Sequence, residues 1–195
     1  MVRSGRSGTM WSMIVWLNGP FGGGKTAVAR ELVAARPDLL PFDPEYVGAL
    51  CRRLAPEQAA DWQDLPLWRE LTVAAADGLL RGYGRPLVVP MTLLREEYAV
   101  EIFHALDDLS WPVFHLVLDA PAEVLRARIA GSQEGGPDPA GVTEVRQWRL
   151  DHIASYERAR AEWLPDAGML LPTACRTPAE IAAEILTLIH DDDRT

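Results

Sequence analysis

The stretch MIVWLNGPFGGGKTAVAREL, residues 13–32, decides the fold, because its centre GPFGGGKT (residues 19–26) fits the phosphate-binding pattern G-x-x-x-x-G-K-[ST]. The apolar run at residues 13–17 is typical of a buried parallel strand. The run AVARELVAAR, residues 27–36, favours a helix, and Pro37 ends it. Strand, glycine-rich loop and helix therefore occur in the order that a phosphate-binding loop requires, which counts against a chance match in a glycine-rich turn.

Each part of the loop has a predicted task. Its glycines lack the Cβ that would keep the backbone from curling around an anion, and the freed N–H groups then point at the phosphates. Lys25 places an ammonium group at the β- and γ-phosphate oxygens, and the Thr26 hydroxyl can bind Mg²⁺. The predicted ATP-binding set in the loop is Gly19, Pro20, Phe21, Gly22, Gly23, Gly24, Lys25, Thr26 and Ala27.

Lys25 is the single lysine of a chain that has 18 arginines. The sequence thus uses arginine for positive charge everywhere except at this position. A planar guanidinium group does not fit the space that an ammonium group fills inside a phosphate loop. The composition therefore supports the phosphate-binding interpretation.

Length, charge and cysteine content restrict the class of protein. The chain has 195 residues, 48% of them hydrophobic, which suits one α/β domain over residues 13–190. A flexible tail at residues 1–12 and an acidic tail at residues 191–195 are expected to flank it. The net charge of −9 disfavours nucleic acid as a partner. We expect Cys51 and Cys175 to be buried free thiols in a cytoplasmic protein without a secretion signal or an integral membrane segment, and the oligomeric state stays open.

Strand-like and helix-like runs alternate along the chain. The predicted strands cover residues 13–17, 39–42, 86–93, 113–120 and 168–173, and the predicted helices include residues 46–53, 122–130, 144–163 and 178–189. This alternation predicts a mostly parallel sheet with helices on both faces and with ligands beyond the carboxyl ends of the strands.

For two segments the sequence pattern allows two structural interpretations each. The breaker-rich segment GSQEGGPDPAG, residues 131–141, is either a solvated surface loop or part of a mobile lid over ATP, with expected lid bounds of about residues 131–145. The last helix carries an apolar face with Ile181, Ile185 and Ile189, which we expect to dock on the sheet rather than lie on a membrane.

The sequence does not support most of the other protein classes that contain such a loop. Motors and transporters need an acidic residue at the end of a strand beside the loop, whereas the third strand ends in PMT, residues 90–92. The Asn-Lys-x-Asp element of GTPases is absent from a chain whose one lysine lies in the loop. Asp119 ends the fourth strand, but the sequence DAPAEVL predicts that it caps the following helix. Small-molecule kinases remain.

Asp43, in PFDPEYVG (residues 41–48), is the candidate acceptor-side carboxylate. Small-molecule kinases need a carboxylate that aligns or deprotonates the acceptor hydroxyl, and an aspartate here can also reach Mg²⁺. The alternative is that Asp43 caps the helix over residues 46–53, with Glu45 as a first-turn charge. The two roles are compatible.

Positive charge for the transition state must come from arginine in addition to Lys25. Arg146 and Arg149 are three residues apart on one predicted helix and share a face. Salt bridges with Glu144 or Asp151 are their alternative role. His115 alternates with apolar strand residues, and we expect it to be structural.

Several segments together resemble the tunicamycin-resistance ATP-binding proteins, namely IVWLNGPFGGGKT, FDPEYVG, LVVPMT, LDAPAEVLRARI, WRLDHI and TPAEIAAEIL. That family is similar to nucleoside monophosphate kinases and to the shikimate, gluconate and chloramphenicol kinases. The resemblance runs from residue 13 to residue 189. It implies a P-loop NTPase three-layer sandwich, with a five-stranded parallel sheet of order 2-3-1-4-5, a small lid, and ATP with Mg²⁺ at residues 19–26.

The resemblance also implies roles for single residues. The implied catalytic residues are Lys25, Asp43 and Arg149, the metal ligands are Thr26 and Asp43, Arg128 adjoins the nucleotide, and the acceptor-facing residues are Asp43, Glu45, Arg52, Trp62, Met91 and Thr92. Core packing is the alternative for Trp62 and for Trp68. The predicted lid lacks the dense basic stretch of nucleotide kinases, so the arginines that act in the transition state stay open. The sequence also shows no arginine set for a nucleoside monophosphate, which favours a neutral or weakly charged acceptor.

The residues and the resemblance lead to one functional hypothesis and two alternatives. We expect an ATP- and Mg²⁺-dependent phosphotransferase that acts on a hydroxyl of a small molecule, and the resemblance implies resistance to tunicamycin-like antibiotics. One alternative is a protein that sequesters the drug with ATP bound and transfers nothing. The other is a nucleoside or nucleotide kinase. Fold alone does not decide among them.

Overall fold

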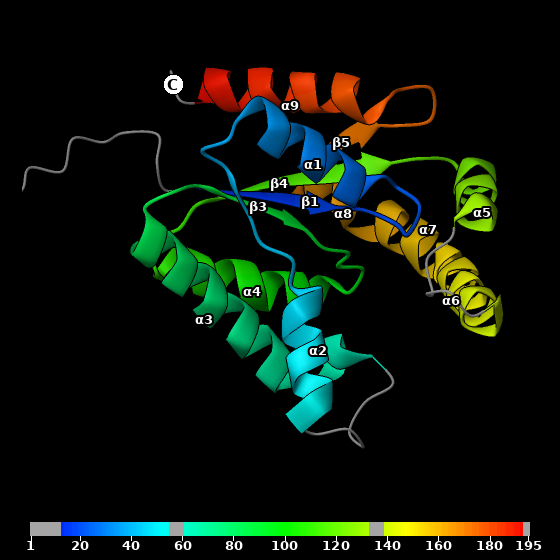
Figure 1. Cartoon of the computed structure of the whole chain (residues 1–195), viewed down its shortest axis with the longest axis horizontal. Helices are drawn as coiled ribbons and strands as arrows, with labels where there is room; N and C mark the ends of the chain where they lie inside the picture. Colours follow the sequence, from blue (N-terminus) through cyan, green and yellow to red (C-terminus); the bar gives the residue numbers. More distant parts are fainter. Residues whose placement is uncertain (1–12, 55–60, 133–138, 193–195) are drawn as a thin grey trace, which may run out of the picture.

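A five-stranded parallel sheet organises the chain, and the computed structural model describes residues 13–54, 61–132 and 139–192 (Figure 1). Its strands are β1 (Ile14–Asn18), β2 (Leu40–Pro41), β3 (Leu87–Pro90), β4 (Val113–Asp119) and β5 (Met169–Pro172). The order is β2-β3-β1-β4-β5, and every neighbouring pair is parallel. The predicted fold class and strand order are confirmed.

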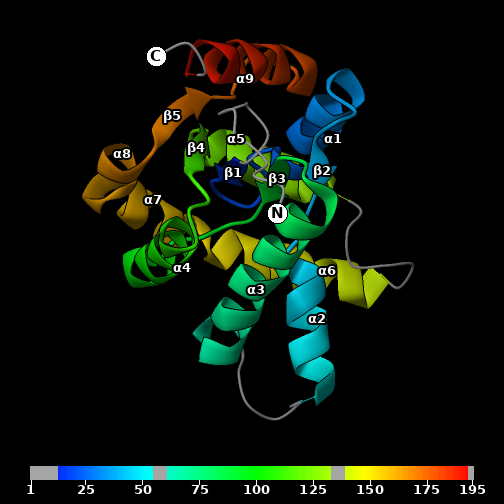
Figure 2. The same cartoon turned by 90° about the vertical axis from the view of Figure 1, so that its left-hand side faces the viewer.

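Helices cover both faces of this sheet, as Figures 1 and 2 show. The helical elements are α1 (Lys25–Ala35), α2 (Glu45–Leu54), the 3₁₀ helix η1 (Trp62–Asp64), α3 (Pro66–Tyr83), α4 (Glu96–Asp108), α5 (Ala122–Gly131), α6 (Pro139–Asp151), α7 (Ile153–Glu162), α8 (Leu164–Ala167) and α9 (Pro178–Asp192). None of the described helices is both long and apolar enough to cross a membrane.

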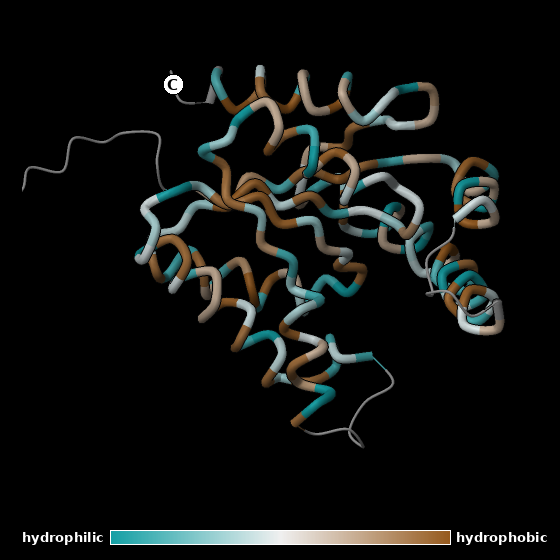
Figure 3. The backbone as a smooth tube through the Cα atoms, in the orientation of Figure 1, coloured by the Kyte–Doolittle hydropathy of each residue, from teal (hydrophilic) through white to brown (hydrophobic). Residues whose placement is uncertain are grey.

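The alternation of side chains along β1 divides the core into two layers. Val15 and Leu17 pack with α1 and α9, whereas Ile14 and Trp16 pack with residues of α3, α4 and α7. Successive residues of a strand point to opposite faces, so a strand that is apolar throughout requires cover on both sides. Figure 3 shows the hydrophobic strands at the centre of the molecule. The result is a three-layer sandwich.

Helix α9 docks on the sheet, as predicted. Ile181, Ile185 and Ile189 are buried in the layer that α1 shares. The helix continues to Asp192, so residues 191 and 192, which were assigned to the acidic tail, are helical. The predicted N-terminal tail at residues 1–12 lies outside the described residues.

The predicted lid differs from a simple loop. Gly131 ends α5, and residues 139–145 already form the first turns of α6, while residues 133–138 lie outside the described residues. The helix predicted over residues 144–163 is divided at His152 into α6 and α7. At this junction the His152 N–H bonds to the Arg149 carbonyl three residues back, at 3.3 Å, rather than four residues back.

The cysteines are only partly as predicted. Cys51 is a buried free thiol on α2. Cys175 is exposed, so the prediction that it is buried was wrong. It lies in the connection between β5 and α9, outside the strands and helices that form the core.

The buried side chain of Asn18 joins three segments of the chain at the end of β1. Its Oδ1 atom accepts hydrogen bonds from the N–H groups of Gly19 and Leu93, both at 2.7 Å. Its Nδ2 atom lies 2.9 Å from the Leu93 carbonyl and 3.1 Å from His115 Nε2. Since Leu93 is bound by this side chain instead of a neighbouring strand, β3 ends at Pro90, earlier than the predicted end at residue 93.

The same contacts fix the proton position on His115, which is buried in β4. Its Nδ1 atom lies 2.8 Å from the Ala167 carbonyl, which can only accept, so Nδ1 carries the proton. Nε2 then accepts from Asn18. Burial lowers the pKa of His115, although the bond to Ala167 opposes the shift. The side chain is thus neutral and structural, in the role predicted for it.

Replacing Asn18 by leucine tests the first of these contacts. Asn18→Leu keeps the size of the side chain but leaves buried N–H and C=O groups without partners, which we expect to lower the free energy of unfolding by about 2–4 kcal/mol. Urea denaturation measures the change. Thr187→Val, at an exposed position of α9 where the hydroxyl bonds to the Ala183 carbonyl, serves as the control and should change stability little. An effect of Asn18→Leu no larger than that of the control would contradict the structural role.

Stability should also depend on pH through His115. Because its pKa is lowered on folding, the unfolded state takes up a proton below about pH 6.5 that the folded state refuses. The contribution of His115 to the free energy of unfolding is therefore fully present above this pH. It declines as the pH falls below this value, with a slope that approaches about 1.4 kcal/mol per pH unit. Denaturant unfolding from pH 7.5 to 5.5 should show this slope, His115→Gln should flatten it, and His104→Gln, at an exposed site, should retain it. A slope that persists in His115→Gln would assign it to other groups.

Candidate functional site

The phosphate-type loop turns into α1 through a glycine in a left-handed conformation. Gly24 has φ of 95° and stands at the N-cap of α1 without a side-chain hydrogen bond to the helix. The first turn of α1 contains no acidic residue. A Cβ built on Gly24 would meet nothing within 4 Å, because the residue faces open space. The N–H groups at the start of α1 are therefore presented to an anion rather than consumed by a cap.

Lys25 lies across the mouth of this loop. Its Nζ atom donates to the carbonyls of Gly19 at 3.0 Å and Pro20 at 2.8 Å, and the Thr92 hydroxyl donates to the Gly19 carbonyl at 3.0 Å. A Cβ on Gly19 would stand 2.6 Å from the Leu118 carbonyl oxygen, so the loop approaches β4 as closely as glycine allows. Gly19, Pro20 and Gly23 are buried and shape the loop from below.

The loop opens into a cavity of about 660 Å³. On the loop side the cavity is lined by Phe21, Gly22, Gly24, Lys25, Thr26 and Ala27, and on the opposite side by Asp43, Glu45, Arg52, Trp62, Met91 and Thr92. Arg128 and Arg149 complete the wall. The structure thus brings together every predicted acceptor-facing residue and most of the predicted ATP-binding residues. The predictions had not included Arg30, Glu144 and Trp148, which also line the cavity and which no local motif marks.

Asp43 caps α2 and also lies at the cavity, a position that suits both of the roles that the sequence left open. Its Oδ1 atom accepts a hydrogen bond from the Glu45 N–H at 2.9 Å, in the manner of a helix cap for α2. The residue also lines the cavity, as does Thr26 of the loop. A carboxylate and a hydroxyl are the oxygen donors that Mg²⁺ prefers, so these residues fit a magnesium ion.

Of the two tryptophans, the structure places Trp68 in the core and Trp62 at the cavity. Trp68 is fully buried in the core, and its Nε1 atom donates to the Pro44 carbonyl at 3.1 Å. Trp62 lines the cavity, with the Arg52 guanidinium 4.1 Å from its ring centroid. A Cβ on Gly48 would stand 2.6 Å from the Trp62 ring, so glycine at this position of α2 lets the ring approach the helix backbone closely.

Helix α6 reaches the loop through an aromatic contact. The Phe21 ring lies 4.7 Å from the Trp148 ring and 5.6 Å from the His152 ring, measured between centroids. The Arg149 guanidinium lies 5.8 Å from the Phe21 centroid, and Arg149 lines the cavity. Arg146, on the same helix, instead donates to the Ser132 carbonyl through Nε at 3.0 Å. Of the two predicted arginines, Arg149 alone lines the cavity.

Arg128 fastens the loop to the end of β5. Its Nη1 atom donates to the Gly22 carbonyl at 3.2 Å and to the Thr173 hydroxyl at 3.1 Å, while Nη2 donates to the Thr173 carbonyl at 2.6 Å. The planar guanidinium group therefore spans two segments that are far apart in sequence. Arg126, two residues earlier on α5, is exposed.

The predicted capping role of Asp119 was wrong. The N-cap of α5 is Pro121, and no side chain caps it. Asp119 instead accepts hydrogen bonds from Arg160 of α7, at 2.8 and 3.0 Å, and from the Tyr156 hydroxyl. Burial raises the pKa of Asp119, but the hydrogen bonds from Arg160 and Tyr156 outweigh it and hold the pKa below its usual value. These partners lie too far along the chain for a local motif to reveal them.

A parallel sheet of this order, with a phosphate-type loop between its central strand and the next helix, defines a P-loop protein of kinase-like fold. The family model described as AAA domain matches residues 14–158, and the chain belongs to this family. No protein with a curated function matches the sequence.

Solved structures support the same assignment. The tunicamycin resistance protein of Deinococcus radiodurans is 26% identical, with 92% of this chain and 96% of that chain covered and a TM-score of 0.65. A gluconokinase from Sinorhizobium meliloti 1021 is 16% identical, with 95% of each chain covered and a TM-score of 0.61. The Mycobacterium tuberculosis APS kinase CysC, solved with AMPPNP and APS, is 20% identical, with 92% and 98% covered and a TM-score of 0.60. The predicted family resemblance is confirmed, and the last two structures share the fold.

The fastening role of Arg128 predicts a change in loop mobility. Arg128→Lys replaces a fork of donors by one point charge that cannot bind Gly22 and Thr173 together, so amide hydrogen exchange at residues 19–26 should become at least about five-fold faster. Exchange followed by mass spectrometry measures this rate. Arg126→Lys is the matched control on the same helix and should leave the rate unchanged. Equal rates in the two variants would show that Arg128 does not hold the loop.

Proposed function

We propose that the protein is an ATP- and Mg²⁺-dependent phosphotransferase that acts on a hydroxyl group of a small molecule. The observation that carries this proposal is the shared cavity, in which the Asp43 carboxylate lines a wall together with Lys25 and the start of α1. A carboxylate near the site of the γ-phosphate is what hydroxyl-directed phosphoryl transfer requires. In a protein that merely bound ATP, this carboxylate would have no task beyond capping α2.

The triphosphate would be held by the loop N–H groups, the start of α1 and Lys25, with Arg128 and Arg149 adjoining it. Thr26 and Asp43 would hold Mg²⁺, which supplies charge neutralisation to the phosphate oxygens. In the part of the chain that the structure describes, no three metal-binding side chains of the His, Cys, Asp and Glu types cluster. This arrangement suits Mg²⁺, which uses one or two carboxylates together with substrate phosphates.

The transfer itself is an in-line displacement. The acceptor hydroxyl oxygen forms a bond to the γ-phosphorus, and the bond from that phosphorus to the β–γ bridging oxygen breaks, so that ADP leaves with the electron pair. The hydroxyl proton passes to the Asp43 carboxylate. Lys25 and Arg149 offset the charge of the phosphoryl oxygens during transfer. Use of ATP in this way suits the expected cytoplasmic location.

Tunicamycin-like antibiotics are the first acceptors to consider. The tunicamycin resistance protein of Deinococcus radiodurans is similar over nearly the whole of both chains. Sequestration of such a drug without transfer is the second candidate function, because a cavity with an aromatic wall at Trp62 can hold a ligand without chemistry. The two functions differ in their need for Asp43.

Transfer is tested with purified protein, Mg-ATP and an acceptor panel that includes tunicamycin, nucleosides, nucleoside monophosphates and chloramphenicol. Mass spectrometry should detect a phosphorylated product with the wild type. Lys25→Ala and Lys25→Arg should both abolish it, since neither a methyl nor a guanidinium group replaces the ammonium group in the loop. Asp43→Asn should lower the rate about 10²- to 10⁴-fold while ATP binding persists. Asp166→Asn, at an exposed site on α8, is the control and should keep full activity.

Two further measurements, drug binding by the purified protein and protection of cells that produce it, separate the candidate functions. Drug binding and cell protection that survive in Asp43→Asn, with no product from the wild type, would replace transfer by sequestration. Product formation from simple nucleosides or nucleotides, with none from the antibiotics, would instead indicate a metabolic kinase.

A further inference from the structure

A second cavity, of about 340 Å³, adjoins the first. It lies between α7 on one side and η1 with the start of α4 on the other. Phe21, Asp61, Gln63 and Thr92 line both cavities, so the two are contiguous. An acceptor whose reacting hydroxyl faces Asp43 can therefore extend past Thr92 into this second space.

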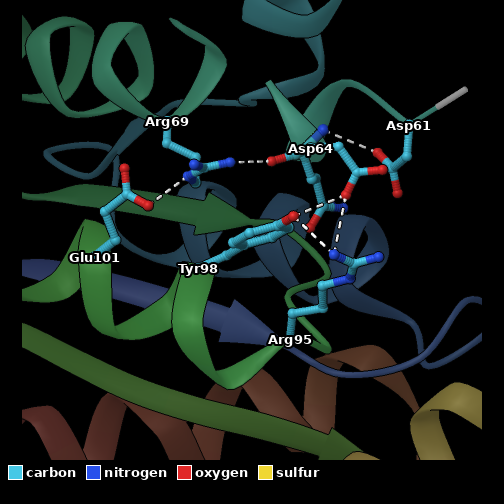
Figure 4. A network of polar contacts seen from close by, with 7 residues as sticks. Asp61, Asp64, Arg69, Arg95, Tyr98 and Glu101 are labelled. Atoms are coloured by element: carbon cyan, nitrogen blue, oxygen red, sulfur yellow. Dashed lines mark hydrogen bonds and ion pairs between the residues drawn. The ribbon is translucent and has the colours of Figure 1, made fainter. Parts of the chain in front are cut away.

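One wall of the second cavity is held in place by a polar network, which Figure 4 shows. Arg95 Nη1 donates to the Tyr98 hydroxyl at 2.8 Å, and that hydroxyl donates to Asp64 Oδ1 at 2.9 Å. The Tyr98 ring lies between two guanidinium groups, with Arg69 at 4.3 Å and Arg95 at 5.1 Å from its centroid. These contacts tie η1 to α4.

Arg69 anchors the network from the buried side. Its Nε atom lies 2.6 Å from a carboxylate oxygen of Glu101, and its Nη1 atom donates to the Gln63 carbonyl at 2.6 Å (Figure 4). The side chain is 10% exposed, so it is locked between α3 and α4. The cavity wall is thus formed before any ligand arrives, which lowers the entropic cost of binding.

The charges around the second cavity are mixed rather than positive. Arg95 and Arg158 line it together with the carboxylates of Asp61, Asp64 and Glu162. Arg95 already lies 3.4 Å from Asp64, so its charge is largely offset. An anionic group such as a phosphate would meet more negative than positive charge here. Hydroxyl groups, in contrast, can donate to carboxylates and accept from guanidinium groups in the same site.

We propose that the second cavity binds a neutral, multiply hydroxylated group of the acceptor, that is, a carbohydrate unit. This inference rests on the proposed phosphotransfer function, which it deepens by naming the chemical class of the acceptor. The phosphorylated hydroxyl lies in the first cavity, and the carbohydrate unit lies between η1 and α7. A phosphate group in the second cavity is disfavoured because it would face the carboxylates of Asp61, Asp64 and Glu162.

A pair of tryptophan substitutions on α7 tests the inference. Ser155 is half-buried and lines the second cavity, so Ser155→Trp fills the space with an indole ring. Ala154→Trp puts the same ring at the neighbouring exposed position and is the matched control. Tyr98→Phe removes only the hydroxyl between Arg95 and Asp64 and serves as a milder second variant. Thermal unfolding and titration with a fluorescent ATP analogue check that each variant is folded and that its loop is intact.

The probes are trehalose, sucrose, cellobiose and N,N′-diacetylchitobiose as neutral disaccharides, with glucose 6-phosphate as the anionic comparison. Saturation-transfer NMR with a non-hydrolysable ATP analogue and Mg²⁺ measures binding. At least one neutral disaccharide should bind the wild type more tightly than glucose 6-phosphate does. Ser155→Trp should weaken it at least ten-fold and Tyr98→Phe about three-fold, with Ala154→Trp within two-fold of the wild type.

Three results would overturn the inference. These are no binding by any neutral disaccharide, tighter binding of glucose 6-phosphate, and equal binding by Ser155→Trp and Ala154→Trp. None of them bears on phosphate transfer, which is measured separately by product formation. Conversely, disaccharide binding without any phosphorylated product would support the second cavity and remove the phosphotransfer function.

Discussion

The buried amide of Asn18 is the contact on which the rest of the site depends. It holds the Gly19 N–H at the first residue of the loop and both backbone groups of Leu93 after β3. Thr92, next to Leu93, returns a hydrogen bond to the Gly19 carbonyl. These hydrogen bonds therefore connect the phosphate-type loop directly to the wall that carries Met91 and Thr92. A carboxamide is needed because only it offers two donors and an acceptor with two lone pairs in so small a volume.

Arginine side chains in this protein hold backbone segments in place through hydrogen bonds to carbonyl groups. Arg85 donates to the carbonyls of three successive residues, 37–39, and Arg128 donates to those of Gly22 and Thr173. A guanidinium group reaches several acceptors at once in a fixed geometry, whereas an ammonium group is a compact point charge. This difference gives the composition a structural meaning. Lys25 stands where a thin, mobile cation suits a changing phosphate group, and arginines stand where the backbone must be held.

Much of the fold could be predicted from local sequence patterns, and so could part of the candidate site. The apolar strands, the loop at residues 19–26 and the parallel sheet were predicted from periodicity and glycine spacing, which are local signals. The strand order came from the family resemblance. Asp119 was misjudged because its partners Tyr156 and Arg160 stand 37 and 41 residues away. The early start of α6 was missed since proline and glycine dominate that segment, although proline is tolerated in a first helical turn. Contacts of the Phe21 ring are likewise invisible until α6 is placed.

The Phe21 ring lines both cavities. It contacts Trp148 of α6 and His152 at the junction of α6 and α7, and it adjoins Lys25 in the loop. A displacement of this one ring changes the shape of both cavities at once. Ligands in the two spaces are then thermodynamically linked, so that whatever factor the first imposes on the affinity of the second, the second imposes on the first. The order in which the two ligands bind therefore affects only the rates of binding. The coupling free energy between the two ligands is the same for either order.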